Sequence, residues 1–159
     1  GSRVRISKGQ RGATAKRDNL RLIAVTLGHE KEEDRESAAR ALLDYGFRKY
    51  QSLELYPKGA VVGSLESPNG NPKTVNVVLP NDFHITVERG KEVDLVTVIE
   101  LETDLPLPVE EGQIVGTISA FYDDELLGTN PLTVGQRVEK LSLPRLVYRL
   151  LNAMAEAVF

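Results

Sequence analysis

Cysteine and tryptophan are absent from these 159 residues, and histidine and methionine are scarce. The lack of cysteine excludes disulfides, thiol nucleophiles and cysteine-ligated zinc. The only histidines, His29 and His84, are 55 positions apart (84 − 29) and lack metal-ligand spacing. We therefore predict no metal site and expect each histidine to be a surface or strand residue. No motif indicates a cofactor.

Other absences narrow the class of partner. The net charge of -3 gives no general nucleic-acid footprint, so we predict no nucleic-acid partner. No apolar run reaches the roughly 20 residues that span a bilayer, and no signal peptide is visible. Residues 1–12 are basic and glycine-rich. We expect them to form a flexible segment rather than a nucleic-acid arm, because no aromatic residue accompanies the charges.

Residues 13–51 have the pattern of a small α/β fragment. Two strands are predicted over 13–16 and 20–27, around a turn at Arg17-Asp18-Asn19. The second strand is an almost continuous apolar run, which is typical of a strand covered on both faces. A helix is predicted from about Glu32 to Tyr50, with acidic residues in its first turn. Its apolar face, expected to cover the hairpin, comprises Ala39, Leu42, Leu43, Gly46, Phe47 and Tyr50.

Beyond residue 52 the pattern becomes one of short strands. Apolar runs recur between turn residues at intervals of about a dozen residues, which is typical of a β-sandwich. The expected strands are 60–65, 74–79, 84–87, 95–101, 114–121 and 126–134. We therefore predict a small β-sandwich domain over residues 52–141. The fold class is mainly β with α.

Two segments of this region are similar to each other. Lys58–Leu65 (KGAVVGSL) matches Glu111–Ile118 (EGQIVGTI) at an offset of 53 (111 − 58). Each has a glycine before the strand and another within it, where glycine permits a tight turn or a bulge. We interpret them as two equivalent strand starts in one sandwich. A lipoyl- or biotinyl-like module is the alternative, but the hairpin tip at Asp123-Asp124-Glu125 lacks the lysine that such a module needs.

Residues 142–159 are predicted to form an amphipathic helix. Pro144 suits its first turn, and one narrow stripe is polar: Arg145, Arg149, Asn152 and Glu156. The broad apolar face would lie on a membrane surface. It comprises Leu146, Val147, Leu150, Leu151, Met154, Val158 and Phe159. The alternative is a helix that packs on its own domain or on a second copy.

Three segments, in this order, resemble the C-terminal portion of bacterial serine-type D-Ala-D-Ala carboxypeptidases, the low-molecular-mass penicillin-binding proteins. They are residues 13–28 (ATAKRDNLRLIAVTLG), 42–47 (LLDYGF) and 111–118 (EGQIVGTI). The resemblance covers nearly the whole chain from Ala13 onward. It implies that residues 13–51 are a remnant of a transpeptidase-like domain, and it favours the membrane-facing interpretation of the terminal helix.

The reacting groups of that family are missing. Its chemistry needs Ser-x-x-Lys, Ser-x-Asn and Lys-Thr-Gly motifs. No serine here has a lysine three positions later, Lys73-Thr74-Val75 lacks the glycine, and Ser67-Pro68-Asn69 lies in a turn-forming stretch. We therefore predict no catalytic residue and expect no hydrolysis by this chain alone.

One residue has a family role by position. The resemblance implies that Arg35 stands where these enzymes hold the substrate's terminal carboxylate, and a guanidinium binds a carboxylate with two parallel hydrogen bonds. An ordinary surface arginine paired with Glu32 or Glu36 is the alternative. Without the other residues of the cleft, Arg35 alone could not give selective binding.

The resulting hypothesis is a non-catalytic C-terminal region that spaces or anchors a D-Ala-D-Ala carboxypeptidase at the membrane during peptidoglycan maturation. The parent enzyme would act on peptidoglycan stem peptides. It would be exported to the outer face of the cytoplasmic membrane or the cell wall. The alternative is a stand-alone β-sandwich scaffold of the cell envelope. Because hairpin 13–27 would have unpaired edges, a homodimer is also expected.

Overall fold

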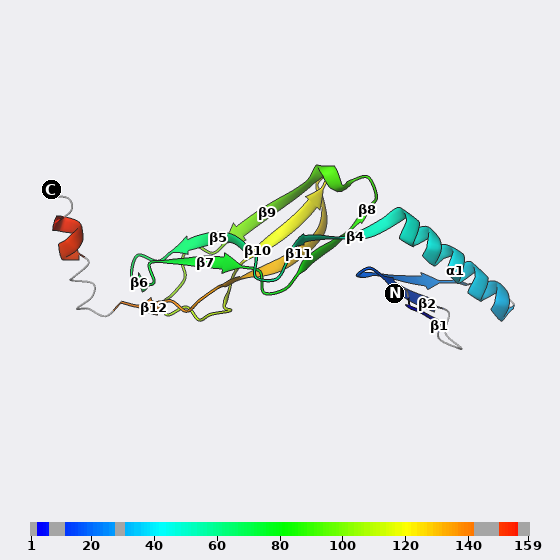
Figure 1. Cartoon of the computed structure of the whole chain (residues 1–159), viewed down its shortest axis with the longest axis horizontal. Coiled ribbons are helices and arrows are strands. Elements are labelled where there is room, and N and C mark those ends of the chain that lie inside the picture. The colour runs from blue at the N-terminus through cyan, green and yellow to red at the C-terminus, as the bar shows by residue number, and fades with distance from the viewer. Residues whose placement is uncertain (1–2, 7–11, 28–30, 142–149, 156–159) are drawn as a thin grey trace. The chain divides into compact units, whose positions relative to one another are not determined.

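The computed structural model describes residues 3–6, 12–27, 31–141 and 150–155 (Figure 1). Predictions for the other residues lie outside this part of the chain. The chain divides into two compact units. Unit 1 comprises Gly1–Leu55, His84–Val96 and Ala120–Gly128, and unit 2 comprises Tyr56–Phe83, Thr97–Ser119 and Thr129–Phe159.

Unit 1 begins with an antiparallel sheet followed by a helix. The sheet has the order β1 (Arg3–Ile6), β2 (Gly12–Arg17), β3 (Leu20–Val25), and α1 spans Glu32–Lys49. Two consecutive residues with positive φ, Asp18 (45°) and Asn19 (64°), close the β2–β3 hairpin at the predicted turn. β1 was not predicted: residues 3–6, expected in a flexible segment, pair with β2.

α1 covers one face of this sheet. The shared core comprises Ala13, Ala15, Leu20, Ala24, Ala39, Leu43 and Phe47, with Leu22 and Tyr50 packed against it. The helix comes so close at Gly46 that a Cβ there would lie 2.6 Å from Leu22 Cδ1. Two expectations were wrong. Leu42, placed on the apolar face, is 51% exposed, and β3 is not covered on both faces, since Ile23 is 71% exposed.

Two further strands follow α1 in unit 1. β4 (Tyr50–Tyr56) begins at the residue after the helix and pairs with β8 (Phe83–Glu88). A 3₁₀ turn, η1, spans Glu92–Asp94. β4 was missed because its sequence, YQSLELY, lacks a continuous apolar run and directly continues a helical pattern.

The main sheet has five strands in the order β5-β7-β11-β10-β9. Their bounds are β5 Val61–Glu66, β7 Thr74–Val78, β9 Leu95–Leu101, β10 Ile114–Tyr122 and β11 Glu125–Val134. With β8, these are the six predicted strands. A short pair, β6 (Gly70–Asn71) and β12 (Glu139–Lys140), was not predicted.

Side chains from these strands form the core of unit 2. The most deeply buried are Val77, Leu79, Val115, Ile118, Leu132, Val134 and Val138. Along β7 buried residues alternate with more exposed ones, as expected for a strand with one face in a core. This mainly β architecture confirms the predicted fold class.

The similar segments around residues 58–65 and 111–118 have the same hydrogen bonds. In the first, Gly59 N–H donates to Leu79 O (2.8 Å) and Ala60 N–H to Pro57 O (3.1 Å). In the second, Gly112 N–H donates to Val134 O (2.9 Å) and Gln113 N–H to Glu110 O (3.0 Å).

Both turn glycines have positive φ, 83° for Gly59 and 80° for Gly112, as the third position of a type II turn requires. The two strands that return to these turns, β7 and β11, pair with each other at the centre of the sheet. The interpretation as equivalent strand starts is therefore confirmed.

The second glycine of each similar segment, Gly63 in 58–65 and Gly116 in 111–118, provides a matched test of packing. A Cβ at Gly116 would lie 2.2 Å from the Glu100 carbonyl oxygen, whereas one at Gly63 would meet only Leu101 Cδ1, at 3.8 Å. Because backbone cannot move aside cheaply, we expect Gly116→Ala to lower the free energy of unfolding by about 3 kcal/mol. Gly63→Ala should change it by less than about 0.5 kcal/mol. Urea unfolding followed by circular dichroism measures both, and equal losses would contradict this packing.

Candidate functional site

The described residues contain no acyl-transfer site. Ser67-Pro68-Asn69 lies at the turn before β6, as expected from its composition. Within the described ranges, no serine hydroxyl has a hydrogen bond to a lysine or histidine nitrogen. No group of three potential metal ligands occurs among them either.

Arg35 lies in the first turn of α1 and is half-buried. Its backbone N–H donates to Lys31 O at 3.3 Å. Among the described residues its guanidinium has no ion pair, so the pairing with Glu32 or Glu36 that the alternative interpretation proposed is not seen. The substrate-carboxylate role of Arg35 stays a prediction.

Only part of the predicted membrane-facing set is described. Leu150, Leu151 and Met154 lie on the helical segment 150–155 and are 61%, 60% and 65% exposed. Leu146, Val147, Val158 and Phe159 lie outside the described residues. Among the residues that the structure describes, no helix has both the length and the apolar character needed to cross a membrane.

The most elaborate polar cluster of unit 1 lies where α1 becomes β4. Tyr50, the first residue of β4, donates its N–H to Gly46 O and so closes the last helical turn. No linker residue separates the helix from the strand. The direction of α1 is therefore fixed to β4 by covalent geometry as well as by hydrogen bonds.

Arg89, just after β8, binds this junction at three points. Its backbone N–H donates to Lys49 O at 2.9 Å. Its guanidinium donates to Gln51 Oε1 (3.1 Å) and to Phe47 O (3.5 Å). Gln51 in turn donates to the carboxylate of Glu92. These contacts tie the end of α1 to β8 and η1.

Glu88 lies between two lysines beside the same junction. Its carboxylate is 3.9 Å from Lys49 Nζ and 3.3 Å from Lys91 Nζ. The charge of Glu88 raises the pKa of Lys49. Its hydrogen bond and charge raise the pKa of Lys91, whose ammonium also lies 5.0 Å from the Tyr122 ring centre. Backbone N–H donors of Glu92 and Gly90 lower the pKa of the Glu92 carboxyl.

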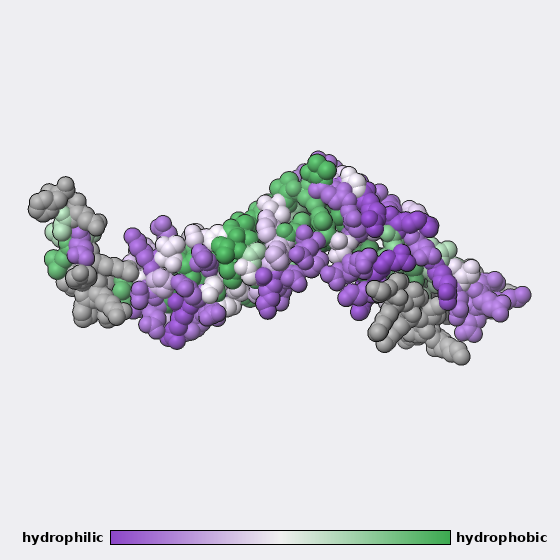
Figure 2. Space-filling view, in the orientation of Figure 1, coloured by the Kyte–Doolittle hydropathy of each residue, from purple (hydrophilic) through white to green (hydrophobic). Residues whose placement is uncertain are grey.

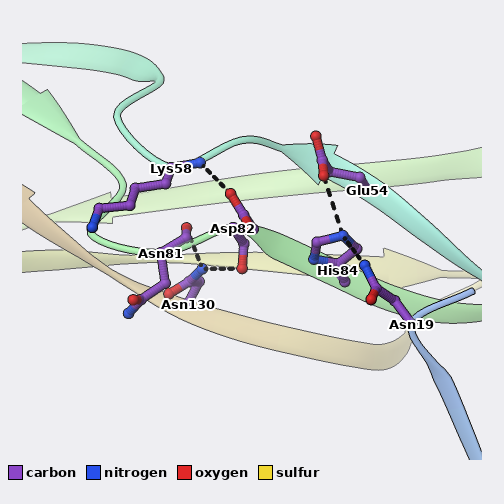
Figure 3. Close-up of polar contacts among 7 residues, drawn as sticks. All are labelled: Asn19, Glu54, Lys58, Asn81, Asp82, His84 and Asn130. Carbon is purple, nitrogen blue, oxygen red and sulfur yellow. Dashed lines mark hydrogen bonds and ion pairs between the residues drawn. The ribbon is translucent and has the colours of Figure 1, made fainter. Parts of the chain in front are cut away.

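His84 links the hairpin turn to β4 and β8 within unit 1. Its Nε2 lies 3.2 Å from Glu54 Oε2 and 3.2 Å from Asn19 Nδ2 (Figure 3). The prediction that His84 is a strand residue is confirmed by its position in β8.

A second polar group, in unit 2, supports the first glycine turn. Lys58 N–H donates to Asp82 Oδ1 at 2.7 Å, and Asn130 Nδ2 donates to Asn81 O at 3.3 Å (Figure 3). We missed this group and the junction because their members are far apart in sequence; Gln51 and Arg89 are 38 positions apart. The hydrogen bonds at the junction orient the elements that they connect.

Comparison with known proteins identifies the family that this chain resembles. Residues 50–140 match the family model described as penicillin-binding protein 5, C-terminal domain. The chain is 26% identical over 129 residues to D-alanyl-D-alanine carboxypeptidase DacF of Bacillus subtilis and 28% identical over 127 residues to DacA of Escherichia coli K12. These alignments cover 80% and 79% of this chain but only 33% and 32% of the relatives.

A solved structure has the same fold. Penicillin-binding protein 5 of Haemophilus influenzae superposes with a TM-score of 0.70 at 25% identity, covering 81% of this chain and 38% of that one. A penicillin-binding protein 3 of Streptococcus pneumoniae matches with a TM-score of 0.67 at 19% identity. The chain thus spans about a third of the length of the curated relatives.

The Glu88 cluster predicts a specific titration change. We expect Glu88→Gln to lower the pKa of both Lys49 and Lys91, because the substitution removes the charge that holds their protons. A lysine whose pKa is raised in the folded state stabilises the fold. This stabilisation is fully present below the unfolded pKa of about 10.4 and is lost as the pH rises through the folded pKa. The stability gap between wild type and variant should therefore shrink in strong alkali. NMR titration of the lysine Cε protons measures both pKa values, with Glu54→Gln as the control that should leave them unchanged.

Proposed function

This chain belongs to the penicillin-binding protein 5 C-terminal domain family, and on that premise we propose that it supports and positions the catalytic domain of a D-Ala-D-Ala carboxypeptidase. The parent enzyme would trim peptidoglycan stem peptides on the outer side of the cytoplasmic membrane. This chain would contribute spacing and attachment, without contributing reacting groups.

The observation that carries the proposal is the uninterrupted α1–β4 junction. A flexible linker lets two parts sample many orientations, whereas a helix that becomes a strand without an intervening loop does not. Arg89 adds hydrogen bonds to the carbonyl groups of the helix end. A catalytic domain built on α1 would therefore be held in a fixed direction relative to β4 and β8.

The terminal helix is proposed as the attachment to the membrane surface. Leu150, Leu151 and Met154 are more than half exposed, so their apolar area is available to a lipid interface. An amphipathic helix with such a face lies in the plane of the interface. This supports a location at the cytoplasmic membrane.

A stand-alone envelope scaffold is the second candidate, and the homodimer belongs with it. On β3 and just after it, Ile23, Val25 and Leu27 form a row of exposed apolar side chains. Hydrophobic residues also gather along β9 (Figure 2). Such surfaces favour association with a second copy or another protein.

The fixed junction is tested by a distance measurement within unit 1. The chain lacks cysteine, so spin labels at Ser37→Cys on α1 and Thr86→Cys on β8 are unique. We expect a narrow distance distribution by double electron–electron resonance. Arg89→Ala with Gln51→Ala should broaden it, because the Phe47 carbonyl loses its guanidinium donor and the side-chain links from Arg89 to Gln51 and from Gln51 to Glu92 are removed. Arg48→Ala, an exposed residue on the same helix, is the control; a broad distribution in the parent chain would remove the spacer function.

Membrane attachment is tested with vesicles. Fully burying a leucine contributes about 1.5–3 kcal/mol. The double variant Leu150→Asn, Leu151→Asn should therefore bind phosphatidylcholine–phosphatidylglycerol vesicles at least tenfold more weakly in co-sedimentation. Asn152→Gln, on the polar stripe, should bind as the unsubstituted chain does. Equal binding by all three forms would show that the helix packs on protein instead.

A further inference from the structure

A cavity of about 180 Å³ lies wholly within unit 2. It forms where three segments meet: the turn before β6, residues 102–109 after β9, and the residues that precede β12. It is separate from the α1–β4 junction, none of whose residues line it. Figure 2 shows hydrophilic residues around the end of the sheet where β6 and β12 lie.

The floor of the cavity is apolar. Its deepest members are Val75, Val109, Val134 and Val138, each at most 4% exposed. Leu65 and Leu107, which are partly buried, extend this surface. An apolar floor of this kind favours the hydrocarbon part of a ligand.

The walls are tied together by backbone hydrogen bonds. Val109 N–H donates to Val138 O at 2.9 Å, and Val138 N–H donates to Val109 O at 2.8 Å. On the facing wall, Ser67 N–H donates to Lys73 O at 2.7 Å, and Leu141 N–H donates to Asn69 O at 2.9 Å. The cavity is therefore formed before any ligand binds, which reduces the entropy cost of binding.

The rim carries three carboxylates without a cation. Glu66, Glu102 and Asp104 line the cavity and are exposed. Among the described residues, no nitrogen of a lysine, arginine or histidine side chain lies within 4 Å of their carboxylate oxygens, whereas nearby Glu110 and Glu139 both pair with Arg137. The opening thus has uncompensated negative charge directly above an apolar floor.

We propose that this cavity binds one arginine or lysine side chain of a partner protein. These side chains combine an apolar stem, which would lie on the valine floor, with a cationic head, which would meet the rim carboxylates. The volume favours a single side chain, because sites for whole small molecules are about 300–1,000 Å³. The surface is therefore a docking point for a basic peptide segment, distinct from the spacer and membrane functions.

Two peptides that differ in one charge test the proposal. The probe is the capped pentapeptide Gly-Ser-Arg-Ser-Gly, and its control has citrulline in place of arginine. Each is titrated into the ¹⁵N-labelled full chain at low ionic strength. We expect saturable amide shifts at Asn69, Glu102–Asp104 and Val138 with the arginine peptide, and binding at least tenfold weaker with citrulline.

Matched variants separate the site from net charge. Glu102→Gln with Asp104→Asn should weaken binding of the arginine peptide at least fivefold. Asp123→Asn with Glu125→Gln removes the same groups from the β10–β11 turn and should leave binding unchanged. Since Glu102 and Asp104 are exposed, the Glu102→Gln, Asp104→Asn variant should keep the wild-type amide spectrum outside the cavity. If that spectrum changes, the single variant Glu66→Gln takes the place of the double variant in the same comparison.

Several outcomes would overturn the proposal. They are equal binding of the two peptides, equal loss in both double variants, or shifts that avoid the cavity. Absence of saturable binding would do the same. Shifts that appear on concentrating the chain alone, at these same residues, would assign the cavity to a second copy and so would also overturn it.

Discussion

The carbonyl groups at the end of α1 need hydrogen-bond donors from outside the helix, and Arg89 supplies donors to two of them. The last four carbonyls of any helix lack intrahelical partners. Here Phe47 O accepts from the Arg89 guanidinium and Lys49 O accepts from the Arg89 backbone. Because β4 starts at the next residue, the same hydrogen bonds that complete the helix also fix the strand. The direction of the α/β fragment relative to β8 depends on this arrangement.

The packing of α1 on the β2–β3 hairpin depends on the absence of a side chain at Gly46. The helix approaches β3 most closely at Gly46, where any side chain would overlap Leu22. Small alanines on β2 and β3 let Leu43 and Phe47 fill the space between the layers. This core is made of few residues, and the hydrogen bonds of Arg89 add to it a connection between α1 and the end of β8.

The sequence predicted those features that local chemistry determines. The Asp18-Asn19 turn, the acidic start of α1 and the two glycine turns each follow from residue types at neighbouring positions. The six main strands follow from apolar runs between turns. β4 was missed because no turn precedes it. The covering of β3 on both faces was inferred from hydrophobicity alone, which does not tell a buried face from an exposed one.

The candidate sites could be predicted only in part, for a related reason. The motifs supplied no catalytic candidate, and the family resemblance supplied the spacer hypothesis. The Arg89 contacts and the acidic rim join residues from separate segments, and no spacing rule connects Gln51 with Arg89 or Glu66 with Asp104. Such groupings emerge only when the strands are paired.

The duplicated glycine turn has a consequence for how the sandwich assembles. In each copy, the turn bonds to the end of a strand about twenty residues later: Gly59 to Leu79 (79 − 59 = 20) and Gly112 to Val134 (134 − 112 = 22). Closing loops this short costs little chain entropy. Each glycine turn is therefore closed by contacts that are local in sequence, whereas the pairing of β7 with β11 is the contact that joins the two repeats into one sheet.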